Sequence, residues 1–241
     1  MNAMEKNAAK KAVTEKTAAK RITVYVADIR PLYEERLLEK AYALADPARR
    51  QKADGCASLR RRAECLAAGL LADEAKRRHG YGGCPICFTE SGQPYLDVPP
   101  GQKKAWISIS HSGDYAACAI GTCPVGVDLQ KKVPLRDRIG TRFFAPGERQ
   151  DTQDALDALD QEDFLRRFTA KEGYMKLTGA GMALGFRRLF VNLDERIVFE
   201  TEHQERKARF LECYAPEGYF LTVCFAPGEQ GGMFPLLSEY R

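Results

Sequence analysis

The sequence lacks the features that mark membrane and secreted proteins. None of its apolar runs approaches the roughly 20 residues that a membrane-spanning helix requires. Its first residues are rich in lysine and alanine and contain no apolar stretch of the kind found in a secretory signal. Glu5 and Glu15 argue against an organelle-targeting peptide, which is poor in acids. We therefore expect a cytoplasmic protein that does not enter a membrane.

A large excess of charge is also missing. There are 37 Lys and Arg residues against 33 Asp and Glu, and part of the basic excess lies before residue 22. A balance this close to neutral gives no reason to expect a nucleic-acid partner. Two basic clusters, at residues 49–52 and 60–62, are compatible with solvated helix faces.

Metal-ligand patterns of the zinc type are scarce. The chain has three histidines and eight scattered cysteines, of which Cys84 and Cys87 form a close pair. A four-ligand zinc site needs a second pair, and the spacing of Cys118 and Cys123 does not supply one. We expect these cysteines to be reduced. A zinc-containing nucleic-acid binder is kept as an alternative with little support.

Helical and strand-rich stretches alternate along the chain. Helices are predicted within residues 31–78 and at residues 136–142, 146–150 and 161–178. Asp46 and Pro47 break the first stretch and fit an N-cap followed by proline at the first helical position. Strands are predicted at residues 22–26, 86–89, 106–110, 115–120, 125–129, 189–193, 197–201, 207–214 and 219–226.

This order of strand, helices and strands occurs twice, which predicts an α+β fold of two similar halves. The halves would span residues 22–125 and 126–228, between tails at 1–21 and 229–241. Each half is of ordinary domain size. A cleft between two such halves is a natural place for a site.

The predicted helix at residues 161–178 carries a carboxylate in an unusual position. On a helical wheel, Glu172 projects into the same sector as Phe168 and Leu165, and Lys176 lies one turn further along. A carboxylate there needs a partner or a metal ion, because burying it unpaired costs several kcal/mol. The alternative is an exposed Glu172–Lys176 pair of small energy, which would place Glu172 on the polar face.

A second acidic residue lies in the predicted strand at residues 125–129. Strand alternation puts Gly126, Asp128 and Gln130 on one face, opposite the apolar residues. Aspartate is uncommon in strands, and Gly126 would leave room for a ligand beside it. A turn-capping role at the strand end is the alternative for Asp128.

The predicted strand at residues 106–110 ends in small polar residues, including Ser110 and His111. Hydroxyls, turn amides and an imidazole together can receive an oxyanion or a phosphate. A Ser–His nucleophile pair is less favoured, because adjacent strand residues face opposite ways. A plain hairpin turn with a solvated histidine is the other alternative.

Together, residues 108–112 (Ser-Ile-Ser-His-Ser), 126–128 (Gly-Val-Asp) and 168–176 (Phe-Thr-Ala-Lys-Glu-Gly-Tyr-Met-Lys) resemble the phosphopantetheinyl transferase superfamily. The similarity is to its two-halved, surfactin-synthetase-activating branch. Residues 92–95 and 142–148 also resemble family segments, and the likeness runs from about residue 22 to 226.

The resemblance implies an α+β pseudo-dimer, monomeric with an internal pseudo-two-fold axis, and an active site in the cleft between its halves. The implied reaction moves the phosphopantetheine arm of coenzyme A to a serine of an apo acyl or peptidyl carrier protein and releases 3′,5′-ADP. Asp128 and Glu172 would hold Mg²⁺, or Mn²⁺ in its place. Glu172 would also deprotonate the carrier serine, and Lys176 would neutralise the pyrophosphate.

The resemblance also implies a set of coenzyme contacts, and two positions depart from the family pattern. The implied contacts are Arg49, Lys52, Gln93, Ser110, His111 and Lys176. Gln130 stands where the family often has a third acid, so an amide oxygen would take that metal position without bringing charge. Gln93 stands where a basic residue is common. A binding module that kept the fold and lost activity is the leading alternative, and the carrier served stays open.

Overall fold

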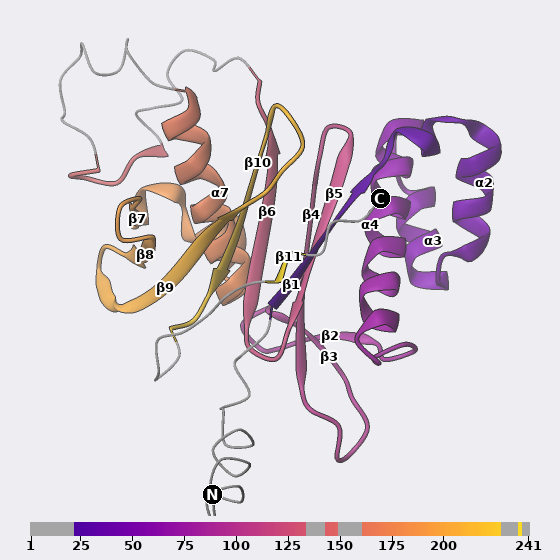
Figure 1. Cartoon of the computed structure of the whole chain (residues 1–241), viewed down its shortest axis with the longest axis horizontal. Coiled ribbons are helices and arrows are strands. Elements are labelled where there is room, and N and C mark those ends of the chain that lie inside the picture. The colour runs from indigo at the N-terminus through magenta and orange to yellow at the C-terminus, as the bar shows by residue number, and fades with distance from the viewer. Residues whose placement is uncertain (1–21, 134–142, 149–160, 228–235, 238–241) are drawn as a thin grey trace, which may run out of the picture.

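Figure 1 shows the computed structural model of the chain, which describes residues 22–133, 143–148, 161–227 and 236–237. The predicted tail at 1–21 and the predicted helix at 136–142 lie outside the described residues. So do the end of the predicted helix at 146–150 and all of the predicted tail at 229–241 except residues 236–237. Within the described ranges, every helix is too short or too polar to span a membrane.

The first half is built on a six-stranded sheet. Its strands follow the order β11-β1-β5-β4-β3-β2, antiparallel except for β11, which pairs parallel with β1. The strands are β1 (Ile22–Asp28), β2 (Ile86–Phe88), β3 (Pro94–Leu96), β4 (Ala105–Ser112), β5 (Tyr115–Gly121) and β11 (Leu236–Leu237). The predicted hairpin at residues 106–120 is therefore confirmed as β4 and β5.

Helices cover one face of this sheet. They are the 3-10 helix η1 (Arg30–Tyr33), α2 (Glu35–Leu44), α3 (Pro47–Asp54) and α4 (Leu59–Arg78). The predicted break is confirmed: the Asp46 side chain caps α3 by accepting a hydrogen bond from the Arg49 N–H at 3.0 Å, with Pro47 in the first turn. Ser58 caps α4 in the same way, through the Arg61 N–H.

The second half has a five-stranded antiparallel sheet of order β6-β10-β9-β8-β7, covered by one long helix. The helix is α7 (Gln161–Thr178), with the bounds that the sequence predicts. The other elements are β6 (Val125–Lys131), η2 (Gly181–Leu184), η3 (Phe186–Arg188), β7 (Leu189–Asn192), β8 (Ile197–Glu200), β9 (His203–Cys213) and β10 (Tyr219–Phe225).

The two sheets share one topology. In each, the first strand pairs with the last and the others follow in descending order, as β1-β5-β4-β3-β2 and β6-β10-β9-β8-β7. The prediction of an α+β pseudo-dimer of similar halves is confirmed by this order. The exact boundary between the halves stays a prediction.

The four layers are helices, sheet, sheet and helix (Figure 1). A core between the sheets joins Val24 of β1 and Ala119 of β5 to Val127 of β6 and Val223 of β10. Separate cores lie between the first sheet and α2–α4, and between the second sheet and α7. Both helical layers thus lie on the outside, and the halves meet through their sheets.

Two predicted elements differ from the structure. Residues 146–148 form a turn where the sequence predicts the start of a helix, because Gly147 adopts a φ of +80° and the Glu148 carboxylate accepts a hydrogen bond from the Ala145 N–H at 2.6 Å. Strand β9 begins at His203, four residues before its predicted start, and its ladder with β8 carries an irregularity at residues 199–200.

Candidate active site

Strand β6 presents Asp128 to helix α7. Val125, Val127 and Leu129 are buried in the core between the sheets, so the alternate residues face the helix. Asp128 is buried as well. The predicted alternation is confirmed, and the turn-capping alternative for Asp128 is not, because its carboxylate faces α7 and β4.

Gly126 makes room for helix α7 and not, as predicted, for a ligand. A Cβ built at Gly126 would lie 2.0 Å from the Gly173 carbonyl oxygen and 2.5 Å from the Leu177 nitrogen. The space beside Gly126 is therefore filled by the backbone of α7, and no ligand enters there. The expectation of room for a ligand was wrong, and the glycine instead lets the helix approach the strand closely.

This close packing places α7 side chains beside Asp128 in a pocket of about 350 Å³. Residues of β4, β6 and α7 line the pocket, so both halves supply its walls. Figure 1 shows β4 of the first half beside β6 of the second. It is lined by Ile109, Ser110, His111, Asp128, Leu129, Gln130, Phe168, Glu172 and Lys176. Six of the residues predicted for the site are among these nine.

Lys176 contacts Asp128 rather than Glu172. Its Nζ lies 2.7 Å from Asp128 Oδ1 and 2.9 Å from Ser110 Oγ. The Ser110 hydroxyl donates to the same Asp128 oxygen at 2.8 Å. An exposed Glu172–Lys176 pair is thus not what the structure shows.

The second carboxylate oxygen of Asp128, Oδ2, differs from Oδ1 in its hydrogen bonding. Oδ2 is buried and has no hydrogen-bond partner among the described residues. A buried charged oxygen without a partner is costly unless a cation or another ligand reaches it. It is therefore a candidate for metal binding.

Glu172 is half-buried and faces this pocket. Burial raises the pKa of its carboxyl above the ordinary value, the nearby charge of Asp128 raises it further, and Lys176 opposes the change. Burial disfavours the charged form, and a like charge does the same. Glu172 is consequently a stronger base than a solvated glutamate.

His111 lies at the rim of the pocket and faces α4. Its Nδ1 is 3.7 Å from the buried carboxylate of Glu64, which also pairs with Arg61 at 3.1 Å. Partial burial lowers the pKa of the imidazole, Glu64 raises it, and the cations Lys176, Arg61 and Arg49 lower it. The ring is therefore neutral at pH 7 and borders a cationic cluster. The Ser–His pair is not formed, since Ser110 bonds to Asp128 and Lys176.

The other three predicted coenzyme contacts do not line the pocket. Arg49 packs its side chain against Gly69 of α4 and lies near enough to influence His111. Lys52 is exposed on the same helix, α3. Gln93 is buried at the C-terminus of α7, where its amide nitrogen donates to the Leu177 carbonyl.

The residues present fit a magnesium ion. Two carboxylates, one with an unpartnered buried oxygen, and the amide of Gln130 supply the oxygen ligands that Mg²⁺ prefers. In the described ranges no group of three or more His, Cys, Asp and Glu side chains is placed to hold a metal ion. A zinc site at Cys84 and Cys87 would need such a group, whereas Mg²⁺ can be held by one or two carboxylates together with substrate oxygens.

A buried ion pair next to the site was not predicted from the sequence. Lys171 is fully buried, and its Nζ lies 2.5 Å from Glu148 Oε2 and 3.0 Å from the Phe143 carbonyl. Burial lowers the pKa of Lys171 to about 8 against the opposing effect of Glu148. A lysine on the apolar side of a helix, next to Phe168 and Met175 on the wheel, was a signal that could have revealed it.

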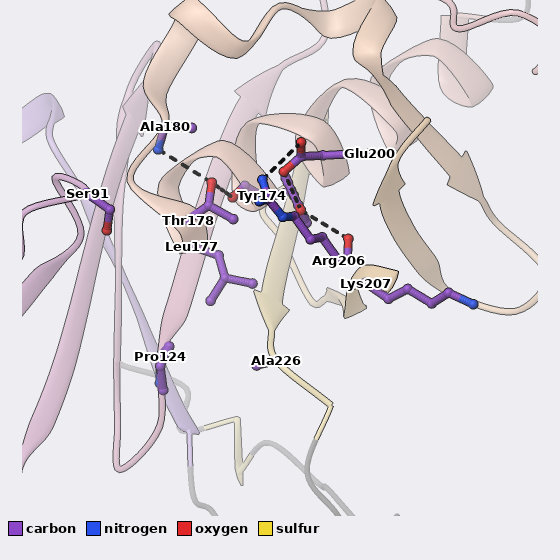
Figure 2. Close-up of a pocket in the computed structure, with 10 residues that line it drawn as sticks. All are labelled: Ser91, Pro124, Tyr174, Leu177, Thr178, Ala180, Glu200, Arg206, Lys207 and Ala226. Carbon is purple, nitrogen blue, oxygen red and sulfur yellow. Dashed lines mark hydrogen bonds and ion pairs between the residues drawn. The ribbon is translucent and has the colours of Figure 1, made fainter. Parts of the chain in front are cut away.

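A second pocket of about 400 Å³ lies at the C-terminal end of α7 (Figure 2). None of the predicted site residues lines it. Three of its polar groups pair with one another: the Tyr174 hydroxyl is 3.1 Å from Glu200 Oε1, and Arg206 is 3.8 Å from Oε2 of the same carboxylate. Figure 2 shows these groups joined on one wall, with apolar Pro124 and Leu177 elsewhere around the pocket.

The pocket between the two pseudo-symmetric α+β halves brings two carboxylates and a lysine together, as the active site of an enzyme does. Residues 124–224 match the family model of the 4′-phosphopantetheinyl transferase superfamily. A 4′-phosphopantetheinyl transferase of Bacillus subtilis is 31% identical over 162 residues, which cover 65% of this chain and 70% of the relative. The chain therefore belongs to the 4′-phosphopantetheinyl transferase superfamily, a family of transferases.

Two further relatives bear on the branch. The 4′-phosphopantetheinyl transferase Sfp of Bacillus subtilis strain 168 is 31% identical over 140 residues, or 57% of this chain and 61% of the relative. The human L-aminoadipate-semialdehyde dehydrogenase-phosphopantetheinyl transferase is 28% identical over 161 residues, or 58% of this chain and 50% of the relative. The chain is thus of the Sfp-like branch, and these two matches span between half and two thirds of the relatives' length.

Proposed function

We propose that this protein transfers the phosphopantetheine arm of coenzyme A to a serine of an apo carrier protein. The observation that supports the proposal best is the pocket between the halves, where Asp128, Glu172 and Lys176 converge. In the reaction the serine Oγ forms a bond to the β-phosphorus of coenzyme A. The bond from that phosphorus to the bridging oxygen breaks, and 3′,5′-ADP leaves.

Asp128 Oδ2, Glu172 and the amide oxygen of Gln130 are the groups that would hold Mg²⁺, with Mn²⁺ as a substitute. When bound, the ion neutralises charge on the pyrophosphate and on the leaving group. The unpartnered state of Asp128 Oδ2 supports its part in this set. Gln130 brings a neutral ligand because its side chain is an amide. Its amide nitrogen donates to the Lys131 carbonyl at 3.4 Å, and its oxygen is the group proposed to bind the ion.

Glu172 is the group that takes the proton of the carrier serine, directly or through a water molecule. Burial and the charge of Asp128 raise its pKa in the protein without a metal ion, which makes the carboxylate a better proton acceptor than a solvated one. A bound cation would oppose this rise, so the position of Glu172 in the pocket is the main support for the role. A general base of this kind contributes about 10²- to 10⁴-fold to rate. The proton that leaves the serine is thus held by Glu172 until solvent removes it.

The cations around the pocket are the groups proposed to bind the phosphates. Lys176 is positioned to contact the pyrophosphate, because its amine already lies at the Asp128 end of the pocket. His111 and Arg49 border the rim, and Lys52 extends from the same helix as Arg49. Gln93 holds the end of α7 in this structure, so a coenzyme contact there requires its amide to change partner.

We further propose that one copy of the chain suffices, since both walls of the pocket come from the same chain. Cytoplasmic location, and partners limited to coenzyme A and an apo carrier, complete the proposal. The carrier of fatty-acid, polyketide, peptide-synthetase or aminoadipate pathways is not distinguished by these features.

The deciding experiment incubates purified protein with coenzyme A, Mg²⁺ and a panel of apo carriers, and follows the carrier mass. Addition of one phosphopantetheine arm to a single carrier serine, absent without Mg²⁺, is the expected result. Coenzyme A binding by calorimetry without any mass change in any carrier would instead indicate a binding module of the same fold. Absence of both would overturn the proposal.

A further inference from the structure

The two halves are joined by side chains rather than by a continuous sheet. Strand β6 is the edge strand of the second sheet, and β10 occupies one of its sides. On the other side lie three serines of β4, a strand in the interior of the first sheet. An edge strand leaves a row of N–H groups without sheet partners, and buried N–H groups need acceptors.

The serine hydroxyls supply those acceptors in order. Ser108 Oγ accepts from the Val127 N–H at 3.0 Å, Ser110 Oγ from Leu129 at 3.2 Å, and Ser112 Oγ from Lys131 at 3.0 Å. Residues that are two apart on a strand share a face and an edge. The serines of β4 and the free N–H groups of β6 therefore recur at the same spacing, every second residue, and each of the three serines meets one N–H. This match fixes the register of β6, and hence of Asp128, against the first half.

Ser110 differs from its two neighbours in what else it contacts. Its hydroxyl proton is donated to Asp128 Oδ1 at 2.8 Å, and it accepts from the Lys176 amine at 2.9 Å as well as from Leu129. A serine hydroxyl has one donor and two acceptor positions. All three are used within the protein, and two of them orient groups of the pocket.

We propose that Ser110 is a positioning residue that orients the Asp128 carboxylate and the Lys176 amine. This inference rests on the proposed function and gives Ser110 a task other than the phosphate contact implied by family resemblance. With Oδ1 held by Ser110 and Lys176, Oδ2 is turned to where it has no protein partner. The free oxygen is thereby held ready for a cation.

The test compares Ser110→Ala with Ser108→Ala. Each variant removes one hydroxyl that accepts from a β6 N–H, but Ser108 contacts neither Asp128 nor Lys176 in the described part of the chain. Hydrogen exchange should accelerate at the Leu129 amide in the first variant and at the Val127 amide in the second. The Mg²⁺ concentration that gives half-maximal enhancement of coenzyme A binding should rise about 10- to 100-fold in Ser110→Ala alone.

Three outcomes separate the roles. Equal Mg²⁺ midpoints in the two variants would reduce Ser110 to a structural hydroxyl and overturn the proposal. Weaker coenzyme A binding without metal, with an unchanged Mg²⁺ midpoint, would indicate that Ser110 contacts a coenzyme phosphate. That result would also overturn the proposal. Recovery of the midpoint in Ser110→Thr, which keeps the hydroxyl, supports positioning. If Ser110→Ala does not fold, Ser110→Cys, with a weaker hydrogen-bonding group of similar size, takes its place.

A further readout is independent of the proposed reaction. Mn²⁺ binding to the protein without coenzyme, followed by electron paramagnetic resonance, should weaken in Ser110→Ala and stay unchanged in Ser108→Ala. A wild-type protein that binds Mn²⁺ in this way and modifies no carrier would contradict the proposed function and leave the role of Ser110 supported. Equal Mn²⁺ affinity in all three proteins would contradict the role of Ser110.

Discussion

Helix α7 carries two lysines, five residues apart, that lie in different surroundings. Lys171 is fully buried against the segment at residues 143–148 and pairs with Glu148. Lys176 is partly exposed at the pocket, with a side-chain exposure of 28%, and pairs with Asp128. The pair at Lys171 is closed by three protein acceptors, whereas the group at Lys176 leaves Asp128 Oδ2 without one. One short motif thus serves both to anchor the helix and to build the site.

The largest effect should come from Glu172→Gln. The variant removes the base while keeping the size of the side chain, so transfer to a carrier should fall by about 10²- to 10⁴-fold. Coenzyme A binding measured without metal should change little. Initial rates by mass spectrometry, together with binding calorimetry, measure both. Near-normal turnover would contradict the general-base role and place Glu172 with Lys171 among the structural residues.

Lys171→Ala should lower the free energy of unfolding more than any substitution in the pocket. The substitution leaves the buried Glu148 carboxylate with Arg167, at 3.8 Å, as its remaining cationic partner, and breaking a buried pair in this way costs about 3–5 kcal/mol. Lys176→Ala is the matched control on the same helix, and its side chain is partly exposed. We expect the control to lose transfer and to keep most of its free energy of unfolding, measured in urea. Similar losses of stability in both variants would break the distinction between the two lysines.

Gly126→Ala tests the close approach that brings α7 to the pocket. The new methyl group would overlap the Gly173 carbonyl, so the helix must move away from β6. Overpacking of this kind costs about 1–3 kcal/mol. Gly82→Ala is the control, because its Cβ would meet a first neighbour at 3.8 Å without positive φ. Unfolding in urea measures the difference, and equal stability would mean that the close approach is not tight.

Much of the fold could be predicted because it depends on local pattern. The extent of α7 followed from its apolar periodicity, and the alternation of β6 followed from three aliphatic residues that the structure buries. Asp128 and Glu172 were found because each broke such a pattern. The roles that the resemblance gives to the site residues stay predictions.

What could not be predicted depends on contacts between distant residues. Ser110 reaches Lys176 across 66 residues of chain, and Lys171 reaches Glu148 across 23. The true neighbour of Gly126 is a helix backbone, which no local pattern of β6 indicates. Gln93 was placed by resemblance to a basic position, while its bond to the Leu177 carbonyl arises from tertiary packing.

Gln130→Glu should strengthen metal binding at the Lys176–Asp128 group and leave the buried Lys171–Glu148 pair unaffected. A third charge facing the pocket should lower the Mg²⁺ concentration for half-maximal transfer by roughly threefold to tenfold, since ligand charge tunes the affinity of such sites. Gln204→Glu, at an exposed position of β9, is the control for added charge. An unchanged midpoint in Gln130→Glu would place residue 130 outside the metal ligands.

The smallest effect concerns the pH dependence of stability without metal. The pKa of Glu172 is raised in the folded protein, so the folded state holds its proton more tightly than the unfolded chain. The stability contributed by the protonated form is complete below the ordinary pKa of 4.5 and is lost as the pH rises through the raised value. At pH 7 the charged carboxylate therefore costs stability, which Glu172→Gln removes.

We expect Glu172→Gln to melt above the wild type at pH 7 in metal-free buffer, and the difference to vanish near pH 4. Glu162→Gln, in the first turn of α7 and 62% exposed, should show a small difference that does not follow this pH dependence. Thermal unfolding at pH 4, 5.5 and 7 measures both. An advantage of Glu172→Gln that persists at pH 4, or no advantage at pH 7, would mean that burial of its charge is not what raises the pKa. Saturating Mg²⁺ should reverse the order at pH 7, because the cation binds the wild-type carboxylate more tightly than a neutral amide.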